Sequence, residues 1–259
     1  DWFLGREKTY KFLRKRSYVF GCYQWAAVEH RGEAAWPRVC SCSGALDLFL
    51  QKKGAFYQNK SHWTKDPMAH IVPHWNFKGL EGREIPVTVY TNCEELELFL
   101  NGKPLGKRQI EKYGHGEWSV EYIPGTLEVK GYIGGKEVCC DKRVTTGRPA
   151  ALKLTQDNDF TANGSDIALF TCECVDENGL TVPDAAEYVH FSVTAPAKII
   201  GTGSDNCDHN NVANTDRKMY MGKIRIAIKP KQGQVSFTLT AMSDNCGVCE
   251  KTVSLCAEN

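Results

Sequence analysis

The chain has 259 residues, 42% of them hydrophobic and 24% charged, and a formal net charge of +1. These values are ordinary for a globular protein with more than one core. A charge so close to zero excludes the strong field that recruits nucleic acid or anionic lipid. No run of about 18 apolar residues occurs, so no membrane span is expected. The start, DWFLGREKTY, is not typical of a signal peptide.

The first 62 residues predict a helix, a strand and a second helix. Glu7 to Arg16 is basic with apolar residues at helical spacing, and Lys52 to Trp63 is also helix-like. Between them, Tyr18 to Trp25 is almost continuously apolar and aromatic, which is typical of a strand buried on both faces in a parallel sheet. The order of elements is that of the end of an alternating β/α series.

Residues 63–83 predict an extended connection, because Pro67 and Pro73 interrupt any regular pattern. Their tryptophans are expected to pack on a neighbouring domain. Residues 84–146 then alternate in short apolar strands, with two-residue hairpin signals at Asn101-Gly102 and Gly134-Gly135. Short strands at this spacing predict an antiparallel β-sandwich.

Residues 147–259 predict a second, immunoglobulin-like sandwich, with strands near residues 151–155, 167–175, 189–194, 223–228 and 235–241. The stretch from Ser204 to Asp216 is rich in Asn and Asp and is expected to be a loop. Its carboxylates, Asp205, Asp208 and Asp216, could bind calcium, but a polar loop is the favoured interpretation.

The 12 cysteines do not have the spacing of a small disulfide framework. Cys172 and Cys174 alternate within a strand-like run, and the pair Cys246 and Cys249 lacks a second pair at zinc-ligand spacing. We expect reduced, largely buried side chains, no metal and no cofactor.

Four stretches resemble family 2 glycoside hydrolases of the β-galactosidase type. YVFGCYQWAAVEHRGEAAWPRVCSCSGALDL, residues 18–48, is similar to the region of the eighth barrel strand, and SHWTKDPMAHIVPHWNFKGLEG, residues 61–82, to the passage from barrel to sandwich. Residues 87–106 resemble the first sandwich after the barrel, and residues 147–179 the last, bacterial immunoglobulin-like domain. The chain departs from the family at Glu29-His30, where Asp-Tyr is common, and in a short loop after Glu33.

The resemblance implies a mainly β chain. Residues 1–62 would be the end of a (β/α)8 barrel, residues 63–83 a linker, and residues 84–146 and 147–259 two immunoglobulin-like sandwiches. The parent enzyme would hydrolyse terminal β-galactosides with retention. The implied partners are a β-galactoside and the rest of the catalytic domain, with no nucleic acid and no membrane, and a homo-oligomer remains open. In a bacterium, reduced cysteines favour the cytoplasm over the periplasm.

No catalytic residue is predicted in this chain. A retaining glycosidase needs two carboxyl groups about 5–5.5 Å apart, carried at the ends of different barrel strands. A βαβ unit takes about 30 residues, and only 17 precede Tyr18. The acid and the nucleophile are therefore expected upstream, and the chain alone should be inactive. Glu29 and Glu33 are interpreted as solvated charges or structural partners, and Asp47 as a residue that orients its loop.

Trp25 is the predicted substrate-binding residue. It ends the predicted strand, where barrel active sites are built, and in the family the matching tryptophan lines the sugar subsite. The alternative is a core tryptophan beneath the barrel rim. His30 and Trp36 are weaker candidates for a second wall.

Two functions of other classes stay open. The sandwiches could bind carbohydrate through an exposed aromatic platform, for which Tyr113, Trp118 and Tyr132 are candidates. They could also be purely structural or assembly domains.

Overall fold

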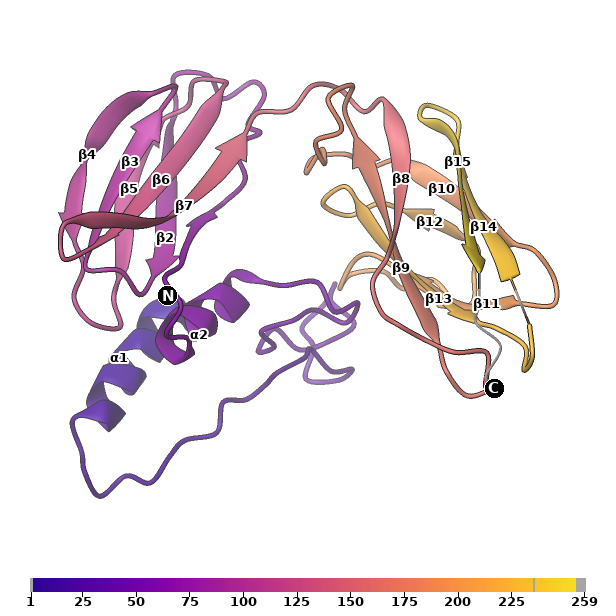
Figure 1. Cartoon of the computed structure of the whole chain (residues 1–259), viewed down its shortest axis with the longest axis horizontal. Coiled ribbons are helices and arrows are strands. Elements are labelled where there is room, and N and C mark those ends of the chain that lie inside the picture. Colours follow the sequence, from indigo (N-terminus) through magenta and orange to yellow (C-terminus); the bar gives the residue numbers. More distant parts are fainter. Residues whose placement is uncertain (1, 235, 255–259) are drawn as a thin grey trace. The chain divides into compact units, whose positions relative to one another are not determined.

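The computed structural model describes residues 2–234 and 236–254 and divides into two compact units (Figure 1). The first unit comprises residues 1–30 and 41–145, and the second residues 31–40 and 146–259. Both consist mainly of β-strands, so the predicted mainly β fold class is confirmed. Within the described ranges, no helix has the length and apolar character needed to cross a bilayer.

The first unit is a β-sandwich with two helices. One sheet has the strand order β1-β2-β5 and the other β4-β3-β6-β7, with antiparallel neighbours throughout. The elements are α1 (Trp2–Arg14), α2 (Gly54–Trp63), β1 (Ala69–Val72), β2 (Glu84–Thr91), β3 (Glu95–Leu100), β4 (Lys103–Gln109), β5 (His115–Glu121), β6 (Thr126–Ile133) and β7 (Lys136–Val144).

Alternation of apolar and polar residues produces this sandwich. In β3 the even-numbered leucines, Leu96, Leu98 and Leu100, are buried, and their odd-numbered neighbours are half-buried. The predicted hairpins are confirmed: Asn101 and Gly102 have φ of 51° and 77°, and Gly134 and Gly135 have φ of 57° and 76°. Two consecutive left-handed residues are what a type I′ turn requires.

Residues 63–83, expected to be an extended connection, form part of this sandwich. Residues 69–72 pair with β2 as β1, and Trp75 is completely buried. Its indole Nε1 donates to the carbonyl oxygen of Ile123 at 3.1 Å. Four residues are too few to show an alternating pattern, so a strand this short cannot be predicted from the sequence. It is identified only by its pairing with β2 in the structure.

Tyr18 to Trp25 does not form the predicted buried strand. Phe20 and Tyr23 are fully exposed, and Trp25 is 69% exposed. A strand needs neighbours that accept and donate its backbone hydrogen bonds. Among the described residues no strand pairs with this segment, so its apolar pattern has nothing to pack against. The helices predicted on either side are present as α1 and α2.

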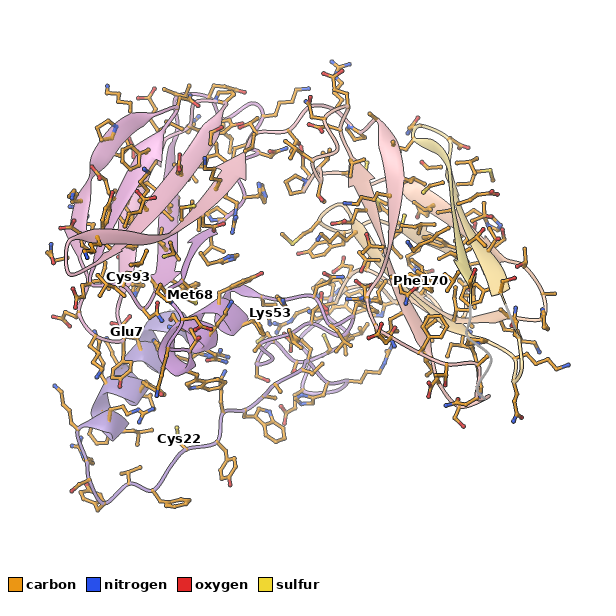
Figure 2. All side chains as sticks on the ribbon, viewed as in Figure 1. Glu7, Cys22, Lys53, Met68, Cys93 and Phe170 are labelled. Atoms are coloured by element: carbon orange, nitrogen blue, oxygen red, sulfur yellow. The ribbon has the colours of Figure 1, made fainter. Side chains whose placement is uncertain are left out.

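The second unit is a sandwich of two four-stranded sheets, ordered β12-β10-β14-β15 and β11-β13-β9-β8. Phe170 of β9 is fully buried in its core (Figure 2). The strands are β8 (Ala151–Gln156), β9 (Ala168–Val175), β10 (Tyr188–Val193), β11 (Lys198–Gly203), β12 (Asp216–Lys218), β13 (Lys223–Lys229), β14 (Ser236–Ser243) and β15 (Gly247–Ser254).

His70 on β1 is held in the neutral form by its surroundings. Its ring stacks on Tyr57 at 3.2 Å, and Arg143 Nη2 lies 3.1 Å from Nδ1. Burial, and after it the Arg143 guanidinium, lowers the pKa of His70 to about 3. Asp141 lies 3.6 Å away, but Arg143 and the Ile71 N–H already engage its carboxylate, so it does not offset these two effects.

The first unit should therefore lose stability in mild acid. Between pH 6.5 and 3 the unfolded chain binds a proton on this imidazole and the folded chain does not, so stability falls as pH falls. The loss is at most about 1.4 kcal/mol per pH unit. Urea unfolding of wild type and His70→Phe at about pH 7.5 and pH 5 measures it. The variant should lose less stability on acidification, and an equal loss in both proteins would contradict this assignment. His190→Gln, an exposed histidine of the second unit, is the control.

Candidate functional site

Trp25 lies on a hollow of about 970 Å³ in the first unit. One wall is the exposed segment 19–25, and the others come from α1 and α2, which lie side by side with the Tyr10 and His62 rings 4.7 Å apart (Figure 1). The Trp25 ring also meets His30 edge to face at 5.4 Å. The structure thus brings together two of the three predicted wall residues, and most of the Trp25 side chain remains exposed.

Polar groups of the hollow come from elements distant in sequence. Arg6 of α1 and Asn59 of α2 line it with Gln24, whose amide oxygen accepts from Arg6 at 2.7 Å in the orientation that satisfies both groups. Such groups suit sugar hydroxyls. Arg6 and Asn59 could not be recognised from the sequence, because no motif spacing connects them to Trp25.

Glu29 is a structural carboxylate rather than an acid or a nucleophile. Its side chain is fully buried, and Oε2 accepts from Ser41 Oγ at 2.7 Å and from the Gly44 N–H at 3.3 Å. Oε1 pairs with the Lys53 ammonium. Gly44 is required here, because a Cβ would lie 2.3 Å from the Glu29 nitrogen. With both oxygens engaged and no exposed surface, Glu29 cannot reach a substrate.

The other two predicted carboxylates are found in loops. Asp47 Oδ1 accepts from the backbone N–H groups of Phe49 and Gln51, both at 2.8 Å, so it orients its loop as predicted. Glu33 is exposed, with a left-handed φ of 49°, on the segment of residues 31–40 that belongs to the second unit.

Trp36 also belongs to the second unit. It is 84% exposed, and its ring lies 4.8 Å from that of His209. His209 Nε2 is 2.8 Å from the Pro37 carbonyl oxygen, and the Val39 N–H donates to Asn206. These contacts attach residues 31–40 to the polar loop between Ser204 and Asp216.

That polar loop is organised around a buried arginine rather than a cation site. Arg217 is 2% exposed and pairs with Asp208. Burial opposes ionisation of Asp208, but hydrogen bonds from Asn210 and then the Arg217 guanidinium hold its pKa below the ordinary value. Asp216 pairs with His190 at 2.8 Å. Across the described part of the chain, no group of three or more His, Cys, Asp or Glu residues is arranged to hold a metal ion.

The three candidate platform aromatics do not form one surface. Trp118 is 7% exposed and belongs to the first core. Tyr113 packs edge to face on Tyr10 at 5.0 Å. Tyr132 donates its hydroxyl to Glu97 at 3.2 Å. The platform predicted for a carbohydrate-binding module is therefore absent at these residues.

Comparison with known proteins gives the family. Residues 152–252 match "Glycoside hydrolase family 2 C-terminal domain 5", and residues 82–139 match "Domain of unknown function (DUF4982)". The chain belongs to the C-terminal region of glycoside hydrolase family 2. The resemblance seen in the sequence is thereby confirmed.

This family 2 chain is similar in sequence to much longer proteins. It is 34% identical over 249 residues to the β-galactosidase BoGH2A of Bacteroides ovatus, covering 93% of the chain and 29% of that protein. It is 31% identical over 250 residues to a β-glucuronidase of Formosa agariphila, covering 94% of the chain and 25% of that protein. The chain therefore spans less than a third of the length of these relatives.

Solved structures with the same fold are also found, at lower sequence identity. A β-glycosidase from Bacteroides vulgatus superposes with a TM-score of 0.90 at 26% identity, covering 96% of the chain and 32% of that structure. A glycosyl hydrolase family 2 member from Bacteroides cellulosilyticus superposes with a TM-score of 0.91 at 27% identity, covering 97% of the chain and 38% of that structure.

Proposed function

We propose that this chain is the C-terminal portion of a retaining hydrolase of terminal β-galactosides. Residues 1–62 would complete the (β/α)8 barrel of that enzyme, and the acid and the nucleophile would lie on barrel strands outside this chain. The observation that carries the proposal is the segment Tyr18 to Trp25. Its apolar sequence fits a strand buried on both faces, yet all four of its aromatic rings are exposed in a chain much shorter than its relatives.

The hollow beside this segment supports the same interpretation. Apolar side chains from α1, α2 and residues 19–25 face an open space of about 970 Å³, which further elements of a longer protein would fill. Neighbouring barrel strands would hydrogen-bond to residues 18–25 and press their side chains onto both helices. Trp25 at the end of the strand would then face the sugar, with its indole plane against the apolar face of the ring.

The two sandwiches would buttress the barrel. The hydrogen bonds of Glu29 with Ser41, Gly44 and Lys53 tie residues 41–53 to the backbone that follows Trp25. A rigid support of this kind is what a substrate-binding side chain needs to keep its orientation.

We expect Trp25→Ala, made in an enzyme that contains this region with the remainder of a family 2 hydrolase, to lower kcat/KM about 10- to 100-fold. Loss of a stacking contact of about 1.4–2.7 kcal/mol gives that factor. The substrate is nitrophenyl β-galactoside, and nitrophenyl β-glucuronide is assayed in parallel because relatives carry both names. Tyr188→Ala, whose ring is 68% exposed on the second unit, is the matched control and should leave kcat/KM unchanged.

The chain alone should not hydrolyse either substrate. Hydrolysis by the purified chain that Glu29→Gln or Glu33→Gln abolishes would refute the proposal. A Trp25→Ala enzyme with normal kcat/KM would refute the sugar-binding role only. Preference for the glucuronide over the galactoside would correct the substrate class.

A further inference from the structure

Two cysteines of the first sandwich lie with their sulfur atoms in contact. Cys93, in the turn between β2 and β3, is 4% exposed (Figure 2), and Cys139 on β7 is half-buried. Their Sγ atoms are 3.5 Å apart, although 46 residues separate them in sequence.

A glycine makes this contact between the sulfur atoms possible. Gly131 on β6 is the register partner of Cys139. A Cβ on Gly131 would lie 2.7 Å from both sulfur atoms, closer than real side chains approach. The β-sheet therefore leaves a gap the size of a methyl group, and the two thiols meet in it.

We propose that Cys93 and Cys139 are a disulfide-forming pair that a small peroxide oxidises in the folded protein. This inference does not depend on the proposed hydrolase function. Only a small oxidant fits, because little of the Cys93 side chain reaches solvent.

Cys93 is the expected nucleophile. The hydrogen bond between the two sulfur atoms lowers the pKa of Cys93 to about 6, although burial opposes this shift. The same contact raises the pKa of Cys139. At neutral pH Cys93 is then largely thiolate, which is the reactive form.

The oxidation proceeds in two displacements. The Cys93 thiolate attacks one oxygen of hydrogen peroxide, the O–O bond breaks, and hydroxide leaves, so that Cys93 becomes a sulfenic acid. Cys139 loses its proton to that hydroxide, and its thiolate attacks the Cys93 sulfur. The S–S bond forms and the sulfenic oxygen leaves as hydroxide, which is protonated to water. Two thiols and one peroxide give one disulfide and two water molecules.

The second sandwich contains a matched pair that should not react. The sulfur atoms of Cys174 and Cys246 are 3.7 Å apart, and both residues are buried. Burial, together with the hydrogen bond to Cys246, raises the pKa of Cys174 to about 12, so this thiol remains protonated. The two pairs therefore have similar distances between their sulfur atoms, but the pKa is lowered for Cys93 and raised for Cys174.

The test is peroxide treatment of the folded, fully reduced chain, followed by alkylation and peptide mapping by mass spectrometry. We expect a cross-linked peptide joining Cys93 to Cys139, while Cys174 and Cys246 stay alkylated. The oxidised chain should also melt several degrees higher than the reduced chain, because the cross-link restricts the unfolded segment between the two cysteines. This rise in melting temperature is measured on the wild-type chain, so a misfolded variant cannot explain it.

Variants separate the steps. Cys139→Ser should abolish the cross-link and leave a sulfenic acid on Cys93 that dimedone traps. Cys140→Ser removes the exposed adjacent thiol and should leave the cross-link in place. The proposal is overturned if the folded chain gives no such cross-link, or if Cys174 and Cys246 are oxidised at the same rate.

Discussion

Replacing Trp75 with alanine is expected to destabilise the first unit by about 3–5 kcal/mol. The ring is completely buried, packs edge to face on Tyr122 at 5.2 Å and on Phe77 at 6.0 Å, and donates to Ile123. Alanine would leave a cavity beside Tyr122 and Phe77 and would leave the Ile123 carbonyl group without this donor. A loss of this size is a large part of the free energy of unfolding of a typical domain, which is about 5–15 kcal/mol.

Chemical denaturation, combined with hydrogen exchange read on peptides from β2, β3 and β6, measures this loss in the first unit itself. Trp63→Ala is the matched control, because that indole is 63% exposed and its removal should cost less than about 1 kcal/mol. Similar losses in the two variants would show that Trp75 does not hold the sandwich together.

Replacing Arg217 with alanine is expected to destabilise the second unit by about 3–5 kcal/mol. Its guanidinium donates to Thr202 Oγ1 through Nε at 3.1 Å and through Nη2 at 3.0 Å, and to the Asn211 carbonyl oxygen at 2.7 Å. It also neutralises Asp208. Removing the arginine leaves a partly buried carboxylate without its cation, and the loop from Ser204 to Asp216 loses the group that organises it.

Lys218→Ala tests the effect of a positive charge alone, because Lys218 is the exposed neighbour on the same strand and its loss should cost less than about 0.5 kcal/mol. The loss of stability in Arg217→Lys should lie between the losses in Arg217→Ala and Lys218→Ala. Lysine keeps the positive charge but lacks the planar guanidinium that donates several hydrogen bonds. Faster hydrogen exchange in residues 204–216 of Arg217→Ala is the local readout. Unchanged hydrogen exchange in these residues would show that Arg217 does not organise the loop.

The candidate site was predicted in part. Trp25 was predicted because it ends an apolar run and because residues 18–48 resemble a barrel strand, and its role in binding stays a prediction. The role of Glu29 could not be found, since Ser41, Gly44 and Lys53 become its partners only when the loop closes. Short-range patterns carry no information about such pairings.

The sequence by itself determined the mainly β class, both helices and the turns at Asn101-Gly102 and Gly134-Gly135, because these depend on residue alternation and on which residues tolerate left-handed backbone. Tertiary structure alone decided three outcomes. Residues 69–72 became a strand because β2 accepted their hydrogen bonds. Two cysteines distant in sequence met where Gly131 left room. Residues 18–25 did not become a strand, because an apolar run forms a β-strand only where neighbouring strands satisfy its backbone groups.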